Sequence, residues 1–142
     1  MSSAVAITNL LYRYGEMMDV ADFEGASDLL RHATLKLMGG REIGGLDMRD
    51  VWNKMIVLDT KGRPNTRHVI TNPILDIDEQ AGEASCRSCY TVLQSLPGFP
   101  LQIIASGRYH DRFARVDGHW RFTFRDYSMF DFQGDLSQHL RM

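Results

Sequence analysis

Four long runs of alternating polar and apolar residues fill the second half of the chain and restrict its fold more than any other feature. They cover Thr66 to Ile77, Glu83 to Ser95, Leu101 to Val116 and His119 to Tyr127. Alternation with a period of two is typical of half-buried β-strands. Short linkers rich in turn residues, such as Leu96-Pro-Gly98 and Val116-Asp-Gly118, separate the runs. Consecutive strands joined this closely are expected to pair antiparallel.

The first half of the chain has helical spacing instead. Apolar residues recur at intervals of three and four from Ile7 to Met18, which predicts an amphipathic helix. A break follows, and Asp22 is placed to cap a second, shorter helix. The predicted elements before residue 66 are helices at about 3–18, 23–30 and 47–58 and a strand at 33–38. Helices first and a curved antiparallel sheet second predict an α+β fold, and no repeat or linker divides residues 1–142.

Charge and hydropathy restrict the partners of such a domain. The 16 basic and 18 acidic residues give a net charge of −2 without the basic stripe that a phosphate backbone requires, so nucleic acid is not expected as a partner. Arg13, Glu16 and Asp19 interrupt the first apolar segment, and the pattern indicates neither a signal peptide nor a membrane span. We therefore expect a cytoplasmic protein that takes a small molecule.

Cys86 and Cys89 form a C-x-x-C, a spacing that on a loop would indicate redox or zinc chemistry. Both residues lie within the strand predicted from Glu83 to Ser95, where a spacing of three sends two side chains to opposite faces. We expect two unrelated thiols and no metal site.

Asp19 and His68 are the first candidates for chemistry. Asp19 follows the first predicted helix, where the negative end of the helix dipole disfavours a charged carboxylate. His68 begins the first long strand on the side of Ile70 and Ile74, which turns its ring toward an apolar layer. Each has an ordinary explanation, as a solvated turn aspartate or as a histidine bonded to a backbone carbonyl. A carboxylate beside His68 would instead fix its tautomer and make it a general base.

Tyr14 and Arg125 are weaker candidates when each is taken alone. Tyr14 belongs to the apolar face of the first helix, so its ring could be plain core with a local partner for the hydroxyl. Arg125 ends the last strand, where an arginine is usually a surface charge or one half of an ion pair. Strict alternation also places Arg125 opposite Trp120 and Phe122, so it reaches a pocket on their side only through a bulge or a strand end.

Three segments together resemble the landmarks of one protein family, in the order in which that family has them. They are Arg13-Tyr14-x-x-x-x-Asp19-x-x-Asp22-Phe23, Thr66-Arg67-His68 and Asp117-Gly118-x-Trp120-Arg121-Phe122-x-x-Arg125. The family is the SnoaL-like, nuclear-transport-factor-2-like group, and the nearest likenesses are scytalone dehydratase, hexachlorocyclohexane dehydrochlorinase and bile acid dehydratase. The resemblance covers almost the whole of residues 1–142 and implies a cone of curved sheet, closed by N-terminal helices around an apolar pocket.

The resemblance also implies a role for each candidate residue. Asp19 matches an aspartate that orients a histidine, and His68 matches the histidine that removes a proton while a leaving group departs. Tyr14 matches a tyrosine of the bile acid enzyme, and Arg125 matches an arginine of the dehydrochlorinase. We therefore expect a lyase for a small hydrophobic, cyclic or aromatic substrate, with no metal or organic cofactor. The Asp19 carboxylate should lie within about 6 Å of the His68 ring.

Some positions depart from the family pattern. Met18 and Gly39 stand where scytalone dehydratase has tyrosines, and Gln94 stands near its second histidine, so scytalone is not expected as the substrate. Leu37 occupies the position of the base aspartate in the similar steroid isomerases. The alternatives with the same fold are an isomerase or polyketide-cyclase-like enzyme, a ligand-binding protein, and the non-catalytic small subunit of an aromatic-ring-hydroxylating dioxygenase.

The long strands carry apolar residues on both faces, for example Val69 and Leu75 on one face and Ile70 and Ile74 on the other. One face packs against the helices, and a large exposed apolar patch is uncommon on a monomer. We therefore expect a homodimer or a homotrimer.

Overall fold

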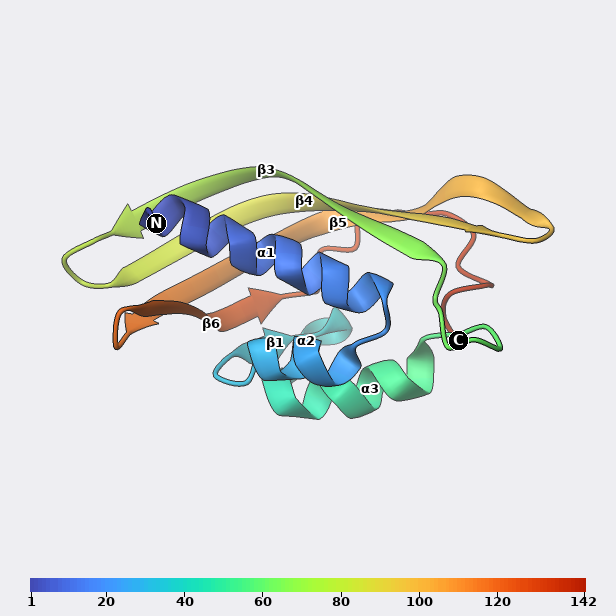
Figure 1. Ribbon diagram of the computed structural model, residues 1–142, viewed down its shortest axis with the longest axis horizontal. Coiled ribbons are helices and arrows are strands. Elements are labelled where there is room, and N and C mark those ends of the chain that lie inside the picture. The colour runs from blue at the N-terminus through green and yellow to red at the C-terminus, as the bar shows by residue number, and fades with distance from the viewer.

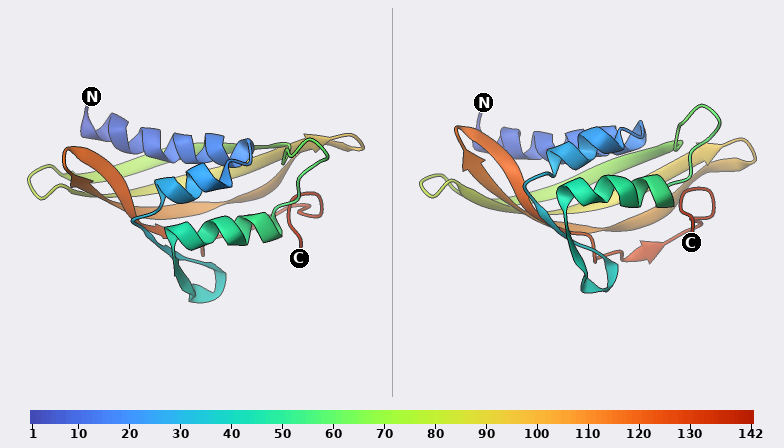
Figure 2. Two further views of the ribbon diagram at one scale, coloured as in Figure 1. Left: turned by 60° about the horizontal axis from the view of Figure 1, so that its bottom comes forward. Right: turned by 90° about the horizontal axis from the view of Figure 1, so that it is seen from below.

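Three helices lie within the curve of a seven-stranded sheet in the computed structural model of the protein, which describes residues 1–142 (Figure 1). The helices are α1 (Ser3–Asp19), α2 (Phe23–Leu29) and α3 (Met48–Met55), with short 3-10 turns η1 (Met38–Gly40) and η2 (Gly45–Asp47). The strands are β1 (Thr34–Lys36), β2 (Glu42–Gly44), β3 (Thr66–Asp78), β4 (Glu83–Leu96), β5 (Phe99–Val116), β6 (His119–Asp126) and β7 (Phe132–Gln133). Figure 2 shows the three helices on one side of the long strands, in the predicted α+β arrangement.

The sheet is open, and its strand order is β2-β1-β6-β5-β4-β3, with β7 paired to β5. The four long strands, β3 to β6, pair antiparallel in chain order, as their short linkers predict. β1 runs parallel to β6, with Leu35 opposite Arg125, so the sheet is mixed and not wholly antiparallel. β2 and β7 have three and two residues, too few to produce a periodic signal in the sequence.

Local signals set the ends of the first two helices. α1 begins after Ser2, whose hydroxyl accepts a hydrogen bond from a backbone N–H of the first turn at 3.3 Å, and it ends at Asp19. The chain turns at Ala21, which has a φ of 59°. Asp22 then caps α2 as predicted, because its Oδ1 accepts the Gly25 N–H at 2.9 Å. This turn leaves Asp19 as the final helical residue of α1.

A bulge in β3 changes which residues face the helices. The pairing with β4 shifts just before Ile74, next to Asn72 with its φ of 54°. His68 and Ile70 face the helices before the bulge, and Leu75 takes that side after it. The expectation that Ile74 shares a face with His68 is therefore wrong, because Ile74 points outward and is 56% exposed.

A bulge in β6 decides the direction of Arg125. The pairing between β5 and β6 skips Thr123, which becomes the extra residue in β6. Phe122 before the bulge and Arg125 after it consequently both face the core, and both are fully buried. The bulge that Arg125 needs in order to reach the inner face is therefore present.

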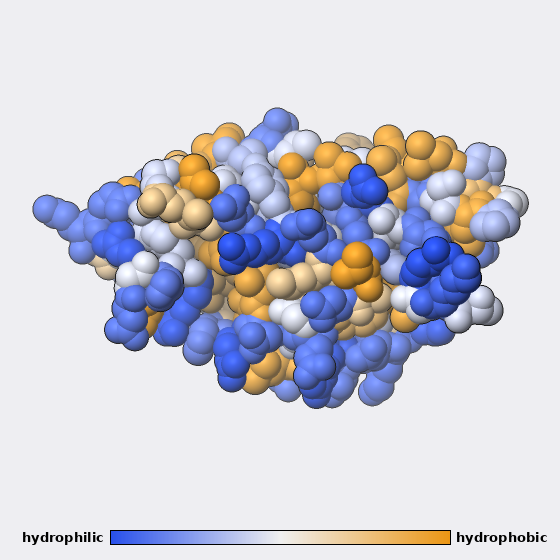
Figure 3. All heavy atoms as spheres, viewed as in Figure 1, coloured by the Kyte–Doolittle hydropathy of each residue, from blue (hydrophilic) through white to orange (hydrophobic).

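The outer face of the sheet exposes apolar side chains. Figure 3 shows hydrophobic residues in orange along the upper side of the molecule, where β3 and β4 run. The exposed large apolar residues of β3 and β5 are Val69, Ile74, Leu101, Ile103 and Val116. This face has no helix packed against it.

Candidate active site

The structure brings Asp19 and His68 together at the junction of α1 and β3. Asp19 Oδ1 lies 2.6 Å from Nδ1 of the His68 ring. The same carboxylate accepts the backbone N–H of His68, with Oδ1 at 3.0 Å and Oδ2 at 2.9 Å. The Thr66 hydroxyl donates a further hydrogen bond to Oδ1 at 3.3 Å. These donors stabilise a carboxylate at a helix end where the dipole disfavours its charge.

The hydrogen bond to Asp19 sets the tautomer of His68. A charged carboxylate only accepts hydrogen bonds, so Nδ1 carries the proton and Nε2 keeps its lone pair. No protein group bonds Nε2, and this nitrogen is not among the fully buried polar atoms. The His68 and Asp19 side chains are 8% and 12% exposed, respectively. An oriented imidazole with a free lone pair and restricted access to water is the arrangement that a general base requires.

A groove between α1 and β3 reaches the pair. Its volume is about 490 Å³, and it is lined by Tyr12, Glu16, Asp19, Val20, Thr66, Arg67, His68 and Ile70. Three of the eight lining residues are hydrophobic, so this space differs from the expected apolar pocket. Within the core, Tyr14 packs on Trp52 with ring centroids 6.2 Å apart, and Trp52 packs on Phe23 at 6.0 Å. These aromatic rings are core residues that pack on one another.

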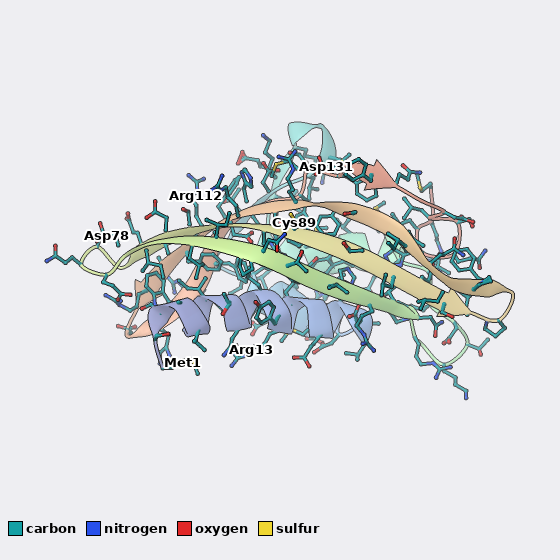
Figure 4. The ribbon with its side chains drawn as sticks, turned by 90° about the horizontal axis from the view of Figure 1, so that it is seen from above. Met1, Arg13, Asp78, Cys89, Arg112 and Asp131 are labelled. Carbon is teal, nitrogen blue, oxygen red and sulfur yellow. The ribbon has the colours of Figure 1, made fainter.

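Tyr14 lies beside His68, and its ring centroid is 6.4 Å from the imidazole in an edge arrangement. Burial raises the pKa of Tyr14, although the Arg125 guanidinium opposes this, so the hydroxyl keeps its proton at neutral pH. The Tyr127 hydroxyl donates to the Tyr14 oxygen at 3.0 Å, which leaves the Tyr14 proton free for another acceptor. Arg13 extends from α1 away from the sheet (Figure 4), so the helix presents Tyr14 to the core.

Arg125 forms a buried ion pair instead of contacting the Asp19–His68 pair. Its Nε and Nη2 donate to the Asp111 carboxylate at 2.7 and 3.0 Å, and both side chains are fully buried. Burial disfavours the charge on Arg125, but the Asp111 carboxylate outweighs this effect and raises the pKa of the guanidinium well above its ordinary value. The guanidinium lies 3.8 Å from the Tyr109 ring centroid and 4.5 Å from that of Tyr14. Arg125 therefore touches the site through the Tyr14 ring.

Two residues of this region are missed by the sequence reasoning. Asp111 sits at an inward position of β5, between Tyr109 and Phe113, and the alternation of that strand could have marked it as buried. His139 lies beyond the last periodic run, where no pattern predicts an element. The pKa of His139 is lowered to about 4, chiefly by burial and in smaller part by the positive charge of a protonated His68, whereas the Asp19 carboxylate opposes the change. His139 is thus electrostatically coupled to the Asp19–His68 pair.

The two cysteines face in different directions, as their strand spacing predicts. Cys86 is buried on the inner side of β4, and Cys89 is partly exposed. No group of three or more histidine, cysteine, aspartate or glutamate side chains is arranged to hold a metal ion. None of the helices combines the length and the apolar character that a membrane span requires.

The chain matches a known protein family. A family described as "SnoaL-like domain" matches residues 1–126. No curated protein matches the chain.

Solved structures share the fold at low sequence identity. A protein of unknown function with a cystatin-like fold from Nostoc punctiforme is 21% identical, with a TM-score of 0.72 and coverage of 92% of this chain and 95% of that one. A protein from Novosphingobium aromaticivorans that is provisionally named a scytalone dehydratase is 20% identical, with a TM-score of 0.65 and coverage of 93% and 89%. The β subunit of a provisionally assigned aromatic-ring-hydroxylating dioxygenase from the same bacterium is 17% identical, with a TM-score of 0.68 and coverage of 97% and 95%. Identities this low establish the fold alone.

Proposed function

The chain belongs to the SnoaL-like domain family, and we propose that it is a cofactor-independent lyase that eliminates water, or a comparable leaving group, from a small hydrophobic substrate. The observation that carries this proposal is the 2.6 Å contact between Asp19 Oδ1 and His68 Nδ1, which leaves the lone pair of Nε2 free on a residue that lines the groove. A cyclic or aromatic β-hydroxy ketone is the substrate class that suits this base, because a neighbouring carbonyl makes the C–H bond acidic enough for an imidazole to deprotonate.

The proposed reaction begins when His68 Nε2 takes the proton from the carbon next to the carbonyl. The electron pair of that C–H bond forms the carbon–carbon double bond, and the bond from the adjacent carbon to its hydroxyl oxygen breaks. The imidazolium then gives its proton to the departing oxygen, which leaves as water, and His68 returns to its neutral form. Asp19 stabilises the imidazolium through the hydrogen bond to Nδ1.

Tyr14 and Arg125 have supporting roles in this proposal. Tyr14 does not line the groove, so a substrate oxygen must pass inward beside the His68 ring to accept the proton of the Tyr14 hydroxyl, whose own oxygen is already bonded by Tyr127. Arg125 holds the Tyr14 ring through the cation–π contact at 4.5 Å and lowers the energy of negative charge near the hydroxyl.

The test uses 4-hydroxy-4-phenylbutan-2-one, an aromatic β-hydroxy ketone whose dehydration gives a conjugated enone with strong ultraviolet absorption. His68→Ala and Asp19→Asn should each slow turnover by about 10² to 10⁴-fold, the usual contribution of a general base. His119→Ala is the matched control, because His119 is exposed on β6. Near-normal turnover by His68→Ala would exclude the lyase mechanism.

A second candidate function follows from the likeness to the dioxygenase β subunit, with its TM-score of 0.68 over 97% of this chain. In that case the chain would support an iron-containing partner and would catalyse nothing itself. The polyketide-cyclase-like, isomerase and ligand-binding alternatives share the fold as well. Absence of any enone from the wild-type protein, together with co-purification of a dioxygenase large subunit, would favour the subunit function.

A further inference from the structure

Backbone hydrogen bonds hold the C-terminal segment, residues 138–141, against the end of α3. The Val57 N–H donates to the His139 carbonyl at 2.8 Å, and the Arg141 N–H donates to the Met55 carbonyl at 2.8 Å. Leu140 forms an isolated antiparallel bridge with Ile56. His139 is therefore held at a defined place by the residues on either side of it.

The same segment is tied to the strands that carry the Asp19–His68 pair. Gln94 Nε2 donates to the Gln138 carbonyl at 3.0 Å, and Gln94 is buried on the inner side of β4. Gln94 pairs with Thr66 in the β3–β4 register, and the Thr66 hydroxyl donates to Asp19. The Gln94 side chain thus connects Gln138, the residue before His139, to the strand position opposite Thr66, which bonds Asp19.

His139 is buried without the partners that a structural histidine normally has. Its exposed fraction is 8%, its Nδ1 is fully buried with no hydrogen-bond partner, and neither ring nitrogen bonds another protein group. Buried polar atoms in folded proteins are nearly always hydrogen-bonded to protein or to ordered water, so the His139 imidazole needs a polar partner that the chain does not supply, either a water molecule or an oxygen of a ligand. The ring is neutral at physiological pH, because burial lowers its pKa to about 4. A neutral imidazole can donate one hydrogen bond and accept another.

We propose that His139 is a second imidazole of the active site, which binds an oxygen atom of the substrate while His68 removes the proton. The inference rests on the proposed function for its reaction step, and it adds a substrate feature, a carbonyl or hydroxyl oxygen held by the C-terminal segment. His139 does not line the groove, so the substrate oxygen that it binds must lie inward of the groove. No proton transfer is needed there, since hydrogen bonding by a neutral ring is enough to orient the oxygen and to stabilise charge on it.

Two substitutions separate a binding role from a packing role. His139→Phe keeps a buried ring but removes both nitrogens, whereas His139→Gln keeps a polar group of similar reach. We expect His139→Phe to lower kcat/KM for 4-hydroxy-4-phenylbutan-2-one by about 10²-fold without loss of thermal stability. His139→Gln should recover part of that loss. A His139→Phe protein with unchanged kcat/KM would overturn the proposal, as would a Gln variant no better than Phe.

Nuclear magnetic resonance of ¹⁵N-labelled histidine provides a readout that does not need turnover. Addition of 4-hydroxy-4-phenylbutan-2-one should shift the ring nitrogens of His139, while those of the exposed His119 stay unchanged. Unshifted His139 nitrogens at saturating compound overturn the inference whatever the kinetics show. If His68→Ala is fully active but the His139 nitrogens shift, the lyase mechanism fails and the binding role of His139 stands.

Discussion

Breaking the buried ion pair of Arg125 and Asp111 should lower the free energy of unfolding by a large amount. In the wild-type protein both side chains are fully buried and are joined by hydrogen bonds of 2.7 and 3.0 Å. Asp111→Asn keeps the size of the side chain but leaves the Arg125 cation unpaired in the interior. Arginine cannot lose its proton to escape this cost. Removing one partner of a buried pair typically costs about 3–5 kcal/mol in the free energy of unfolding. In a protein of 142 residues, each kcal/mol lost from the free energy of unfolding lowers Tm by about 3 °C, so Tm should fall by roughly 9–15 °C.

The exposed pair of Arg108 and Asp131 is the matched control. Its geometry is the same, with Nε and Nη2 donating to the carboxylate at 2.8 and 3.0 Å, but the side chains are 50% and 27% exposed. Asp131 lies in the segment between β6 and β7 (Figure 4). Water can replace a lost partner there, so Asp131→Asn should change the free energy of unfolding by about 1 kcal/mol or less.

Urea denaturation followed by circular dichroism measures both variants under identical conditions. The double variant Arg125→Met, Asp111→Leu should recover much of the loss, because a buried pair replaced by apolar groups leaves no unpaired charge. If Asp111→Asn costs no more than Asp131→Asn, the account of Arg125 as one half of a buried pair is wrong. Arg125 would then have to be stabilised by another group, and a direct role for it at the substrate would regain support.

Three further results are expected. The free energy of unfolding should fall by about 3 kcal/mol as pH drops from 6.5 to about 4, because His139 takes up its proton at a higher pH in the unfolded chain than in the folded one. Urea titrations of the His139→Phe variant should not show this loss. Light scattering should report a homodimer or a homotrimer, with the exposed outer face of the sheet as its interface. The double variant Ile74→Lys, Ile103→Lys places charges on that face and should give a monomer of 16.2 kDa. Asp22→Ala should lower the free energy of unfolding by about 1 kcal/mol, measured in urea, because it removes the cap of α2.

The long elements were predictable because each repeats its pattern over several turns or alternations. The four long strands, the first two helices and the cap at Asp22 follow from spacing alone. The parallel pairing of β1 with β6 could not be predicted from spacing, because the three residues of β1 carry no periodic signal and the pairing joins segments about ninety residues apart. The bulges at Asn72 and Thr123 were equally invisible, and each reverses the face of every residue after it.

The site was predictable where it depends on element ends. Asp19 at the end of a helix and His68 at the start of a strand follow from periodicity, and the resemblance to the SnoaL-like family supplied the reason to pair them. The partner of Arg125 was not predictable, because contact with Asp111 requires the β6 bulge. His139 was not predictable either, since its position depends on hydrogen bonds from Val57 and on the tie between Gln94 and the neighbouring carbonyl.

Asp19 has a structural task as well as its proposed chemical one. β3 is an edge strand of the sheet, and an edge strand has backbone N–H groups with no strand beside them. The Asp19 carboxylate accepts one of these, the His68 N–H, with both oxygens, while it holds the His68 ring. Loss of the carboxylate therefore affects the closure of α1 onto the sheet and the orientation of the base together. His68→Ala removes only the ring and keeps the backbone bond, so a loss of turnover without a loss of stability in that variant assigns the effect to chemistry.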